Sequence, residues 1–247
     1  MAFDLTTLDA PFTSLKAYDW GGDAAPFATI DAAVIASHAD KPLRDELEKR
    51  LTAILAPGTS RAAKEYACRK LMMIGTAASV PALAALLGDN DNSHMARFAL
   101  ERINAPQAAE ALRKALGEVS SNLKIGMISS LAARGDVASV PLLAGLLGGE
   151  PTIAAAAAEG LGILRTPEAL QALTSADPMA ANGVGQAVVD ARLACAETLL
   201  AAGKRADAMA VYKALAAAAA GNPTSKSIEL AATRGILACL DTLSAAS

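Results

Sequence analysis

The side chains that could carry out chemistry are few in this sequence, and they form no catalytic or metal-binding pattern. The chain has two histidines, His38 and His94, and three cysteines, Cys68, Cys195 and Cys239. His-Glu-x-x-His and Cys-x-x-Cys spacings are absent, so no metal site is predicted. Glycine-rich phosphate loops and the Gly-x-Ser-x-Gly turn are absent too. We therefore expect no enzyme, no catalytic residue and no cofactor.

The cysteines are odd in number, and each lies inside an apolar helical run. Cysteines in that setting are usually small buried side chains of a reduced protein. A reactive thiol is the alternative interpretation.

One helical segment brings a histidine, an arginine and a glutamate close in sequence. Arg97 and Glu101 are four residues apart, so they share a helix face and can pair with each other or reach a neighbouring repeat. His94 stands at the start of the same helix. We interpret it as an exposed neighbour of the helix cap rather than as a catalytic base.

A polar helix predicted at 105–116 offers the best candidates for contact with a partner. Its projecting polar side chains are Gln107, Glu110, Arg113 and Lys114. The comparable stretches at 79–88 and 138–148 show mainly Ala, Leu and Gly. Arg113 and Lys114 are the first candidates for binding an acidic group on a partner, and a merely solvated face is the alternative.

Trp20 is the only tryptophan in the chain. An indole can stack on a ligand, but it more often contributes a large apolar surface to packing. We predict that Trp20 packs against the first repeat, and stacking on a ligand is the alternative.

The composition favours closely packed helices. Hydrophobic residues make up 53% of the 247 residues and aromatics only 3%, the difference being carried by alanine. Alanine has the best helix propensity and loses no side-chain entropy on burial. The net charge of −3 argues against a nucleic-acid partner, which normally requires a basic patch. Without a signal peptide or membrane span, we expect no membrane partner and, if the chain is complete, a cytoplasmic location.

A ten-residue stretch that recurs organises the chain. Ser-Val-Pro-Ala-Leu-Ala-Ala-Leu-Leu-Gly at 79–88 returns 60 positions later, at 139–148, as Ser-Val-Pro-Leu-Leu-Ala-Gly-Leu-Leu-Gly. Weaker copies begin at 104 and 166. Self-similarity with a unit of about 30 residues is typical of a tandem helical repeat.

Each repeat is predicted to be a helical hairpin. First helices are expected at about 60–74, 92–103, 121–134 and 151–164, and second helices at about 79–88, 105–116, 138–148 and 167–175. Prolines in the first turns of the second helices lose no hydrogen bond there, and they are Pro81, Pro106, Pro141 and Pro167. Predicted N-caps are Ser79, Asn104 and Thr166, and predicted C-caps are Gly88, Gly117 and Gly148.

This pattern of an apolar first helix, a turn and a Val-Pro-x-Leu-x-x-Leu-Leu-Gly second helix resembles the HEAT repeat. The similarity, over 60–175, is to the short bacterial form also found in phycobilin-lyase-type proteins. It implies an all-α fold, a right-handed α-α superhelix of helical hairpins, in which the second helices line a concave surface. On this chain, that surface would present the four second helices to a protein or peptide partner.

The flanking segments are expected to continue the same solenoid. Residues 1–23 are predicted to be an extended arm with one helical turn that caps the first repeat. The HEAT-like region, 24–176, would open with a helical pair at 26–38 and 43–56. Region 177–247 would hold a long helix at 182–202 and a last helix at 225–243. Residues 192–215 resemble a tetratricopeptide hairpin.

Repeats without a catalytic pattern favour a non-enzymatic scaffold for protein interaction or domain spacing, as part of a longer protein or alone. The resemblance leaves two alternatives open, a phycobilin-lyase-like tetrapyrrole-handling enzyme and a HEAT-like nucleic-acid-binding protein. The repeat register also makes a stability prediction. Leu86→Ala or Leu146→Ala should cost a few kcal/mol, about as much as other core truncations.

Overall fold

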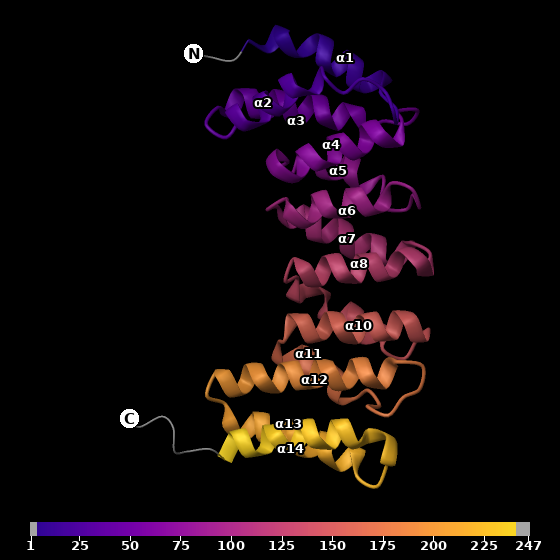
Figure 1. Ribbon diagram of the computed structural model, residues 1–247, viewed down its shortest axis with the longest axis vertical. Coiled ribbons are helices and arrows are strands. Elements are labelled where there is room, and N and C mark those ends of the chain that lie inside the picture. Colours follow the sequence, from indigo (N-terminus) through magenta and orange to yellow (C-terminus); the bar gives the residue numbers. More distant parts are fainter. Residues whose placement is uncertain (1–3, 241–247) are drawn as a thin grey trace. The chain divides into compact units, whose positions relative to one another are not determined.

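The computed structural model describes residues 4–240, which form helices joined by short loops and contain no strand (Figure 1). The chain divides into two compact units, residues 1–134 and residues 135–247. Unit 1 contains a 3-10 helix η1 (Leu5–Leu8) and α1 (Asp9–Ala17), α2 (Phe27–Ala36), α3 (Lys41–Ile54), α4 (Arg61–Ile74), α5 (Val80–Ala84), α6 (Ser93–Arg102), α7 (Pro106–Glu118) and α8 (Ser121–Ala133).

Unit 2 contains η2 (Val137–Ser139), α9 (Val140–Leu146), α10 (Pro151–Leu164), α11 (Pro167–Thr174), α12 (Val184–Ala201), α13 (Arg205–Ala219), η3 (Pro223–Ser225) and α14 (Lys226–Leu240). The predicted all-α fold of helical hairpins is confirmed. Predicted and observed helices agree closely, apart from α1 and from α5, which gives way to turns before Gly88. Residues 241–243 of the predicted last helix lie outside the described residues. None of the helices between residues 4 and 240 has the length and hydropathy of a membrane span.

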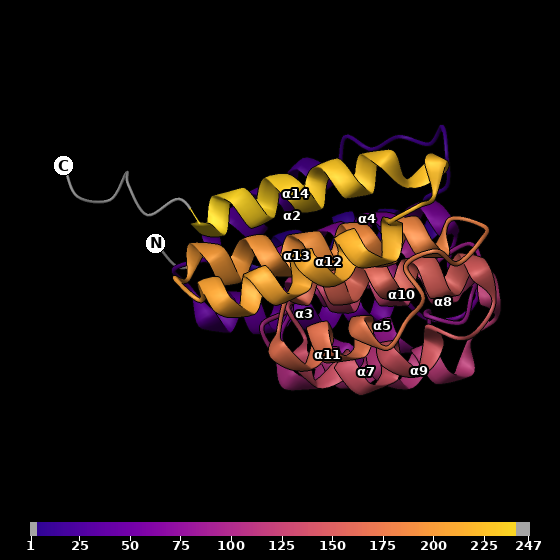
Figure 2. The same ribbon diagram turned by 90° about the horizontal axis from the view of Figure 1, so that it is seen from below.

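In unit 1 the first helices of successive repeats pack on one another, α4 on α6 and α6 on α8. The second helix α5 packs on α7, and both lie to one side of α4 in Figure 2. The repeat length explains the core, because Leu71, Leu100 and Leu131 fall at equivalent positions and are all fully buried. Each such leucine contributes roughly 1.5–3 kcal/mol by leaving water.

The helix starts confirm part of the predicted capping. All four prolines lie at the first or second position of their helices. Thr166 caps α11 by accepting a hydrogen bond from the Ala169 N–H at 3.1 Å. Asn104 is not a cap, because Pro106 fixes the start of α7 and leaves Ala105 at the N-cap position. Ser79 occupies the N-cap position of α5, but its hydroxyl donates to the Thr76 carbonyl instead.

The predicted glycine C-caps are wrong in their conformation. Gly88, Gly117 and Gly148 lack the left-handed backbone that such caps require, and Gly117 lies inside α7. Left-handed glycines occur instead in tight turns between helices, such as Gly135 (φ 65°) and Gly203 (φ 75°). Between α7 and α8, for example, the chain turns through Val119 and Ser120, whose backbone angles need no glycine.

Residues 9–17, predicted to be extended, form α1. Pro11 does not interrupt this helix because it falls in the first turn, where its missing N–H has no partner to lose. Leu8, Phe12 and Leu15 follow helical spacing and are buried. This short helix packs against α2, α3 and α4.

Charged side chains at several hairpins satisfy backbone groups at helix ends. Glu48 is buried and accepts hydrogen bonds from the Thr76 N–H at 2.6 Å and the Ser79 N–H at 3.2 Å. Arg192 is also buried, and its guanidinium donates to three carbonyl oxygens at the end of α11, those of Leu173, Thr174 and Ala176. Such bonds supply partners for the carbonyls that a helix end leaves unpaired.

Small residues dominate the packing of unit 2. Helices α10 and α12 approach so closely that a Cβ on Gly162 would lie 2.7 Å from the Cβ of Ala191. Helices α13 and α14 meet where a Cβ on Gly235 would lie 2.3 Å from Tyr212 Cε1. The predicted helical hairpin α12–α13 is present, with Gly203 in its turn.

Candidate binding site in unit 1

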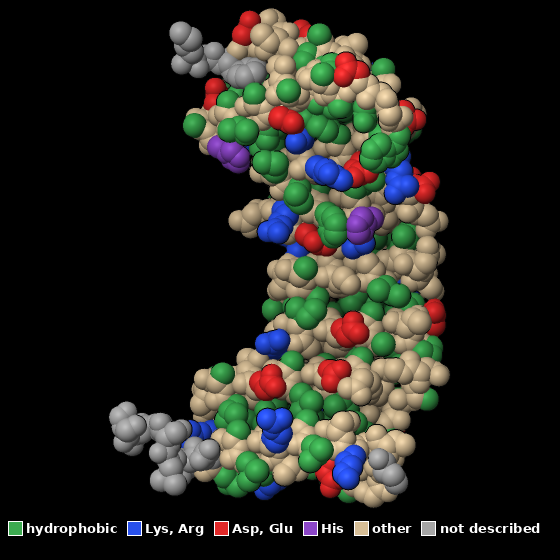
Figure 3. Space-filling model, viewed as in Figure 1, with side chains coloured by type: hydrophobic (Ala, Val, Ile, Leu, Met, Phe, Trp, Pro, Cys, Tyr) green, Lys and Arg blue, Asp and Glu red, His purple; other side chains and the backbone are tan. Residues whose placement is uncertain are grey.

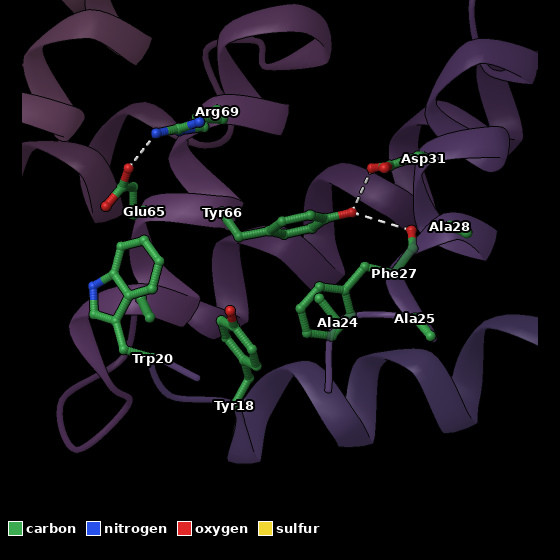
Figure 4. A pocket seen from close by; sticks show the side chains of 11 residues that line it. Tyr18, Trp20, Ala24, Ala25, Phe27, Ala28, Asp31, Glu65, Tyr66 and Arg69 are labelled. Atoms are coloured by element: carbon green, nitrogen blue, oxygen red, sulfur yellow. Dashed lines mark hydrogen bonds and ion pairs between the residues drawn. The ribbon is translucent and has the colours of Figure 1, made fainter. Parts of the chain in front are cut away.

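A pocket of about 440 Å³ lies where the loop after α1 meets α2 and α4 (Figure 4). We name it the aromatic pocket. Its aromatic and charged lining residues are Tyr18, Trp20, Phe27, Asp31, Glu65, Tyr66 and Arg69. Alanines complete the wall, so the rings and the charged groups define its chemistry.

The loop that carries Tyr18 and Trp20 is held in place by local hydrogen bonds. Tyr18 follows the end of α1, and its carbonyl accepts a hydrogen bond from the Ser60 hydroxyl at 2.5 Å. The same hydroxyl accepts from the Ala63 N–H and so caps α4. Further along, Gly21 adopts a left-handed backbone (φ 82°), as a tight turn requires. One serine therefore fixes both the loop and the helix that carries Tyr66.

Three of the rings form a continuous cluster. The Tyr18 and Phe27 centroids are 4.9 Å apart, with the ring planes at 83°. Those of Phe27 and Tyr66 are 5.0 Å apart, with the planes at 50°. Edge-to-face contacts of this kind are favourable and hold rings in fixed orientations. The pocket wall is therefore preformed.

A carboxylate and an ammonium group orient Tyr66. Its hydroxyl donates to Asp31 Oδ1 at 2.6 Å and lies 3.3 Å from the Phe27 carbonyl oxygen. Lys70 Nζ lies 2.6 Å from the same Asp31 oxygen and 4.8 Å from the centre of the Tyr66 ring. Burial raises the pKa of Asp31, but the hydrogen bonds from Lys70 and Tyr66 outweigh it and leave the pKa below its ordinary value.

Glu65 and Arg69 form an ion pair one helical turn apart on α4. The Arg69 side chain is 70% exposed, so the pair is screened by water and contributes at most about 1 kcal/mol. Both residues also line a second pocket of about 430 Å³. The two pockets therefore share a wall.

This second pocket, which we name the apolar pocket, lies between α4 and α6. Its lining residues are Arg61, Glu65, Cys68, Arg69, Met72, His94, Met95 and Phe98. His94 is exposed, as predicted, and its ring centroid lies 4.3 Å from that of Phe98. The face of unit 1 seen in Figure 3 accordingly shows hydrophobic side chains among charges of both signs.

The titratable groups in these pockets suit binding better than proton transfer. Burial raises the pKa of the Cys68 thiol to about 12, so the thiol stays protonated and weakly nucleophilic near neutral pH. Burial and the bond to Asp31 also raise the pKa of Tyr66. Among the described residues, no three His, Cys, Asp or Glu side chains are grouped as they would be around a metal ion.

The four residues predicted to bind a partner lie together on α7. Gln107, Glu110 and Lys114 are exposed, and Arg113 is half-buried. None of them lines the aromatic or the apolar pocket. Their contact with a partner remains a prediction.

The predicted pairing of Arg97 and Glu101 is confirmed, and it extends to the next repeat. Arg97 Nη1 is 4.0 Å from the Glu101 carboxylate and donates to Ser130 Oγ and the Gly126 carbonyl oxygen, both at 2.9 Å. The Ser130 hydroxyl donates to Glu101 at 2.6 Å. This network joins α6 to α8 and has a structural role.

The prediction that Trp20 packs against the first repeat is wrong. Its side chain is 78% exposed, whereas Tyr18, two residues earlier, is half-buried against Phe27. The indole borders the pocket and is largely exposed to solvent. The sequence feature that could have indicated this pocket is the occurrence of Tyr18, Trp20 and Phe27 within ten residues of a chain that is otherwise poor in aromatics.

The family model of the PBS lyase HEAT-like repeat matches residues 94–118 and 153–176. The first match covers α6 and α7 of unit 1, and the second covers α10 and α11 of unit 2. The chain therefore contains HEAT-like repeats, as the sequence pattern predicted. No curated protein matches the sequence significantly. The aromatic pocket is built by residues that precede the first matched repeat.

Proposed function

We propose that this HEAT-like repeat protein is a non-enzymatic scaffold that binds a protein or peptide partner, and that the aromatic pocket anchors the partner. The observation that carries the proposal is the exposure of Trp20 beside a pocket walled by three further rings. Exposed tryptophans and tyrosines next to a hollow are frequent hot spots of protein interfaces. Covering such an indole would recover hydrophobic free energy.

Preorganisation supports this proposal. The rings of Tyr18, Phe27 and Tyr66 are held by mutual contacts and by the Asp31 hydrogen bond before any partner arrives. A partner would thus have to order little more than Trp20, and less binding free energy would be lost to conformational entropy. Stacked helical hairpins commonly offer such extended recognition surfaces.

The two adjoining pockets also suit a peptide. Their volumes, about 440 and 430 Å³, fall within the range of small ligand sites. Because Glu65 and Arg69 separate them, one extended segment could place one side chain in each. The exposed Phe98 and Met72 would give the second anchor an apolar surface.

Selection from a random peptide library displayed on phage tests the proposal. Selected peptides should bind the wild-type protein and lose at least about tenfold in affinity for Trp20→Ala, as expected for a hot-spot residue. The matched control is the double variant Arg113→Ala/Lys114→Ala on α7, which should bind as wild type. The proposal that the aromatic pocket anchors the partner would be overturned if no peptide were selected, or if the selected peptides bound Trp20→Ala as tightly as the wild type. Dependence on the α7 double variant instead would place the partner on the second helices.

A further inference from the structure

We infer that the aromatic pocket is a receptor for an organic cation, presented as the ammonium or guanidinium group of a lysine or arginine on the partner. The inference rests on the proposed function and specifies the chemistry of its anchor. It follows from the rings, from a cation already bound within the chain and from the distribution of charge around the pocket.

The wall of the pocket is electron-rich. The faces of aromatic rings carry the negative end of the ring quadrupole and attract a cation within about 6 Å, with tryptophan the strongest of the side chains. Four rings line the pocket, and the Phe27 ring is inclined to those of Tyr18 and Tyr66 by 83° and 50°. Non-parallel rings surround a space instead of stacking on one another. Trp20, the most exposed of them, stands where an entering group would meet it first.

The protein already uses this chemistry at the same cluster. Lys70 Nζ lies over the Tyr66 ring and pairs with Asp31, yet Lys70 is not among the residues that line the pocket. An ammonium group is thus accepted by one ring and one carboxylate of the pocket wall. A ligand cation would make the same pair of interactions with Trp20 and Glu65 on the open side.

The two carboxylates of the pocket differ in how firmly they are engaged. Asp31 accepts from both Tyr66 and Lys70, and the Lys70 side chain is only 20% exposed. Glu65 is paired with Arg69, which is largely in solvent. A ligand cation could replace Arg69 beside Glu65, or share the carboxylate with it, at little cost in free energy, because the ion pair is exposed. Glu65 is therefore the carboxylate available to a ligand.

An anionic ligand would meet unfavourable surroundings. It would face the negative ring faces and the carboxylates of Asp31 and Glu65, whose cationic partners are Lys70, outside the lining, and the exposed Arg69. An uncharged side chain would gain apolar contact but no ion pair with Glu65. The charge of the ligand is thus the property to test.

The single tryptophan makes the test direct, because all of the tryptophan fluorescence of the protein comes from Trp20. Peptides selected as above would be titrated in matched pairs. Citrulline replaces arginine, and 2-aminoheptanoic acid, whose pentyl side chain has the length of lysine, replaces lysine, so that the charge is removed and the length is kept. We expect the charged member to bind about three- to thirtyfold more tightly. Equal affinity within each pair would overturn the inference.

Variants distinguish the rings from general attraction by charge. Glu65→Gln should weaken charged peptides and leave neutral isosteres unchanged. By calorimetry, Trp20→Phe should keep more affinity than Trp20→Leu, because only the former retains a ring. Incorporation of fluorinated tryptophans should lower affinity stepwise with each fluorine. Trp20→Leu binding as tightly as Trp20→Phe would contradict the role of the ring.

Tetramethylammonium separates this inference from the proposed function. Saturable quenching of Trp20 by this ion, weakened by Glu65→Gln, would support the cation receptor even if the library yielded no peptide. Conversely, peptides that require Trp20 but bind equally well with citrulline or 2-aminoheptanoic acid would support the peptide scaffold and overturn the cation receptor. The control is tert-butanol, a neutral molecule of similar size and shape, which should not quench Trp20.

Discussion

The two units of this protein are built from similar hairpins, but they differ in which side chains fill and border them. Seven of the eight aromatic residues lie in residues 1–134, and Tyr212 alone lies in the second unit. The pockets of unit 2, at about 540 and 520 Å³, are larger than those of unit 1. Alanines and glycines provide much of their lining, however. Volume alone therefore does not make a recognition site.

The difference shows what small and large residues do in a helical repeat. In unit 2, Gly162 lets α10 approach the backbone of α12 at Ala191, and Gly235 makes room for the Tyr212 ring. In unit 1, Phe27 and Tyr66 span between helices and leave a hollow bordered by polar groups. We interpret unit 2 as a packed spacer and unit 1 as the binding unit, and the following experiments test that division.

The largest effects should come from equivalent core leucines. Leu83 and Leu143 occupy the same position in the recurring ten-residue stretch and are both fully buried. Replacing either by alanine should cost about 3–5 kcal/mol. Hydrogen exchange resolved by peptide should show the loss within the mutated unit. A much smaller loss for Leu143 would mean that the alanine-rich unit collapses into the void.

The half-buried Leu146 provides the control for this pair. The sequence predicted similar costs for Leu86→Ala and Leu146→Ala, but only Leu86 is buried. We now expect Leu146→Ala to cost less than Leu86→Ala. Equal losses would show that Leu146 is covered in solution.

Removing the buried Arg192 from unit 2 should have the next largest effect. Arg192→Met would leave the carbonyl oxygens of Thr174 and Ala176 without the guanidinium donor, while that of Leu173 would keep its bond from the Ala176 N–H. Unpaired buried polar groups cost about 1–3 kcal/mol each, so we expect a loss of roughly 3 kcal/mol in denaturant unfolding. Arg192→Lys should recover part of it. Wild-type stability of the methionine variant would show that water replaces the guanidinium.

Gly235→Ala tests the close packing of unit 2. Its new Cβ would overlap Tyr212, and we expect a destabilisation of about 1–3 kcal/mol. Gly145→Ala in α9 is the matched control, because no atom beyond its chain neighbours and the nearby backbone of its own helix lies within 4 Å of its Cβ position. That control should be neutral or stabilising by about 0.5–1 kcal/mol. If thermal unfolding showed that both substitutions destabilise the protein, or that neither does, the packing explanation would be rejected.

Trp20→Ala should separate binding from stability in unit 1. Because the side chain is 78% exposed, its loss should change the free energy of unfolding by no more than about 0.5 kcal/mol. Chemical denaturation followed by circular dichroism measures this change. A large loss of stability would return Trp20 to the packing role that the sequence first suggested.

The smallest expected effect is a pH dependence confined to unit 1. The pKa of Asp31 is lowered in the folded protein, so its contribution to stability is present above the unfolded pKa and is lost as pH falls through the folded value. In the Asp31→Asn variant, hydrogen exchange in α2 and α4 should therefore change less than in the wild type as the pH falls below about 4. If the variant and the wild type showed the same pH dependence of exchange, the ion pair between Asp31 and Lys70 would not be formed in solution.

The repeat register could be read from the sequence because proline and leucine act locally. Pro81, Pro106, Pro141 and Pro167 all begin their helices as predicted, since a proline fixes its own backbone angle. The predicted glycine caps failed because glycine permits a left-handed turn without requiring one. The helix at 9–17 was not predicted, although its Pro11 falls in the first turn, where a proline is tolerated.

The sequence by itself determined that the chain is helical and where its hairpins lie, because these features depend on spacing along a helix. Only the tertiary structure decided that Glu48 is buried, that Trp20 is exposed and that Tyr18 and Tyr66 share a pocket. Tyr18 and Tyr66 lie 48 positions apart in the sequence. No local rule relates such distant residues, and their meeting depends on how α1, α2 and α4 pack.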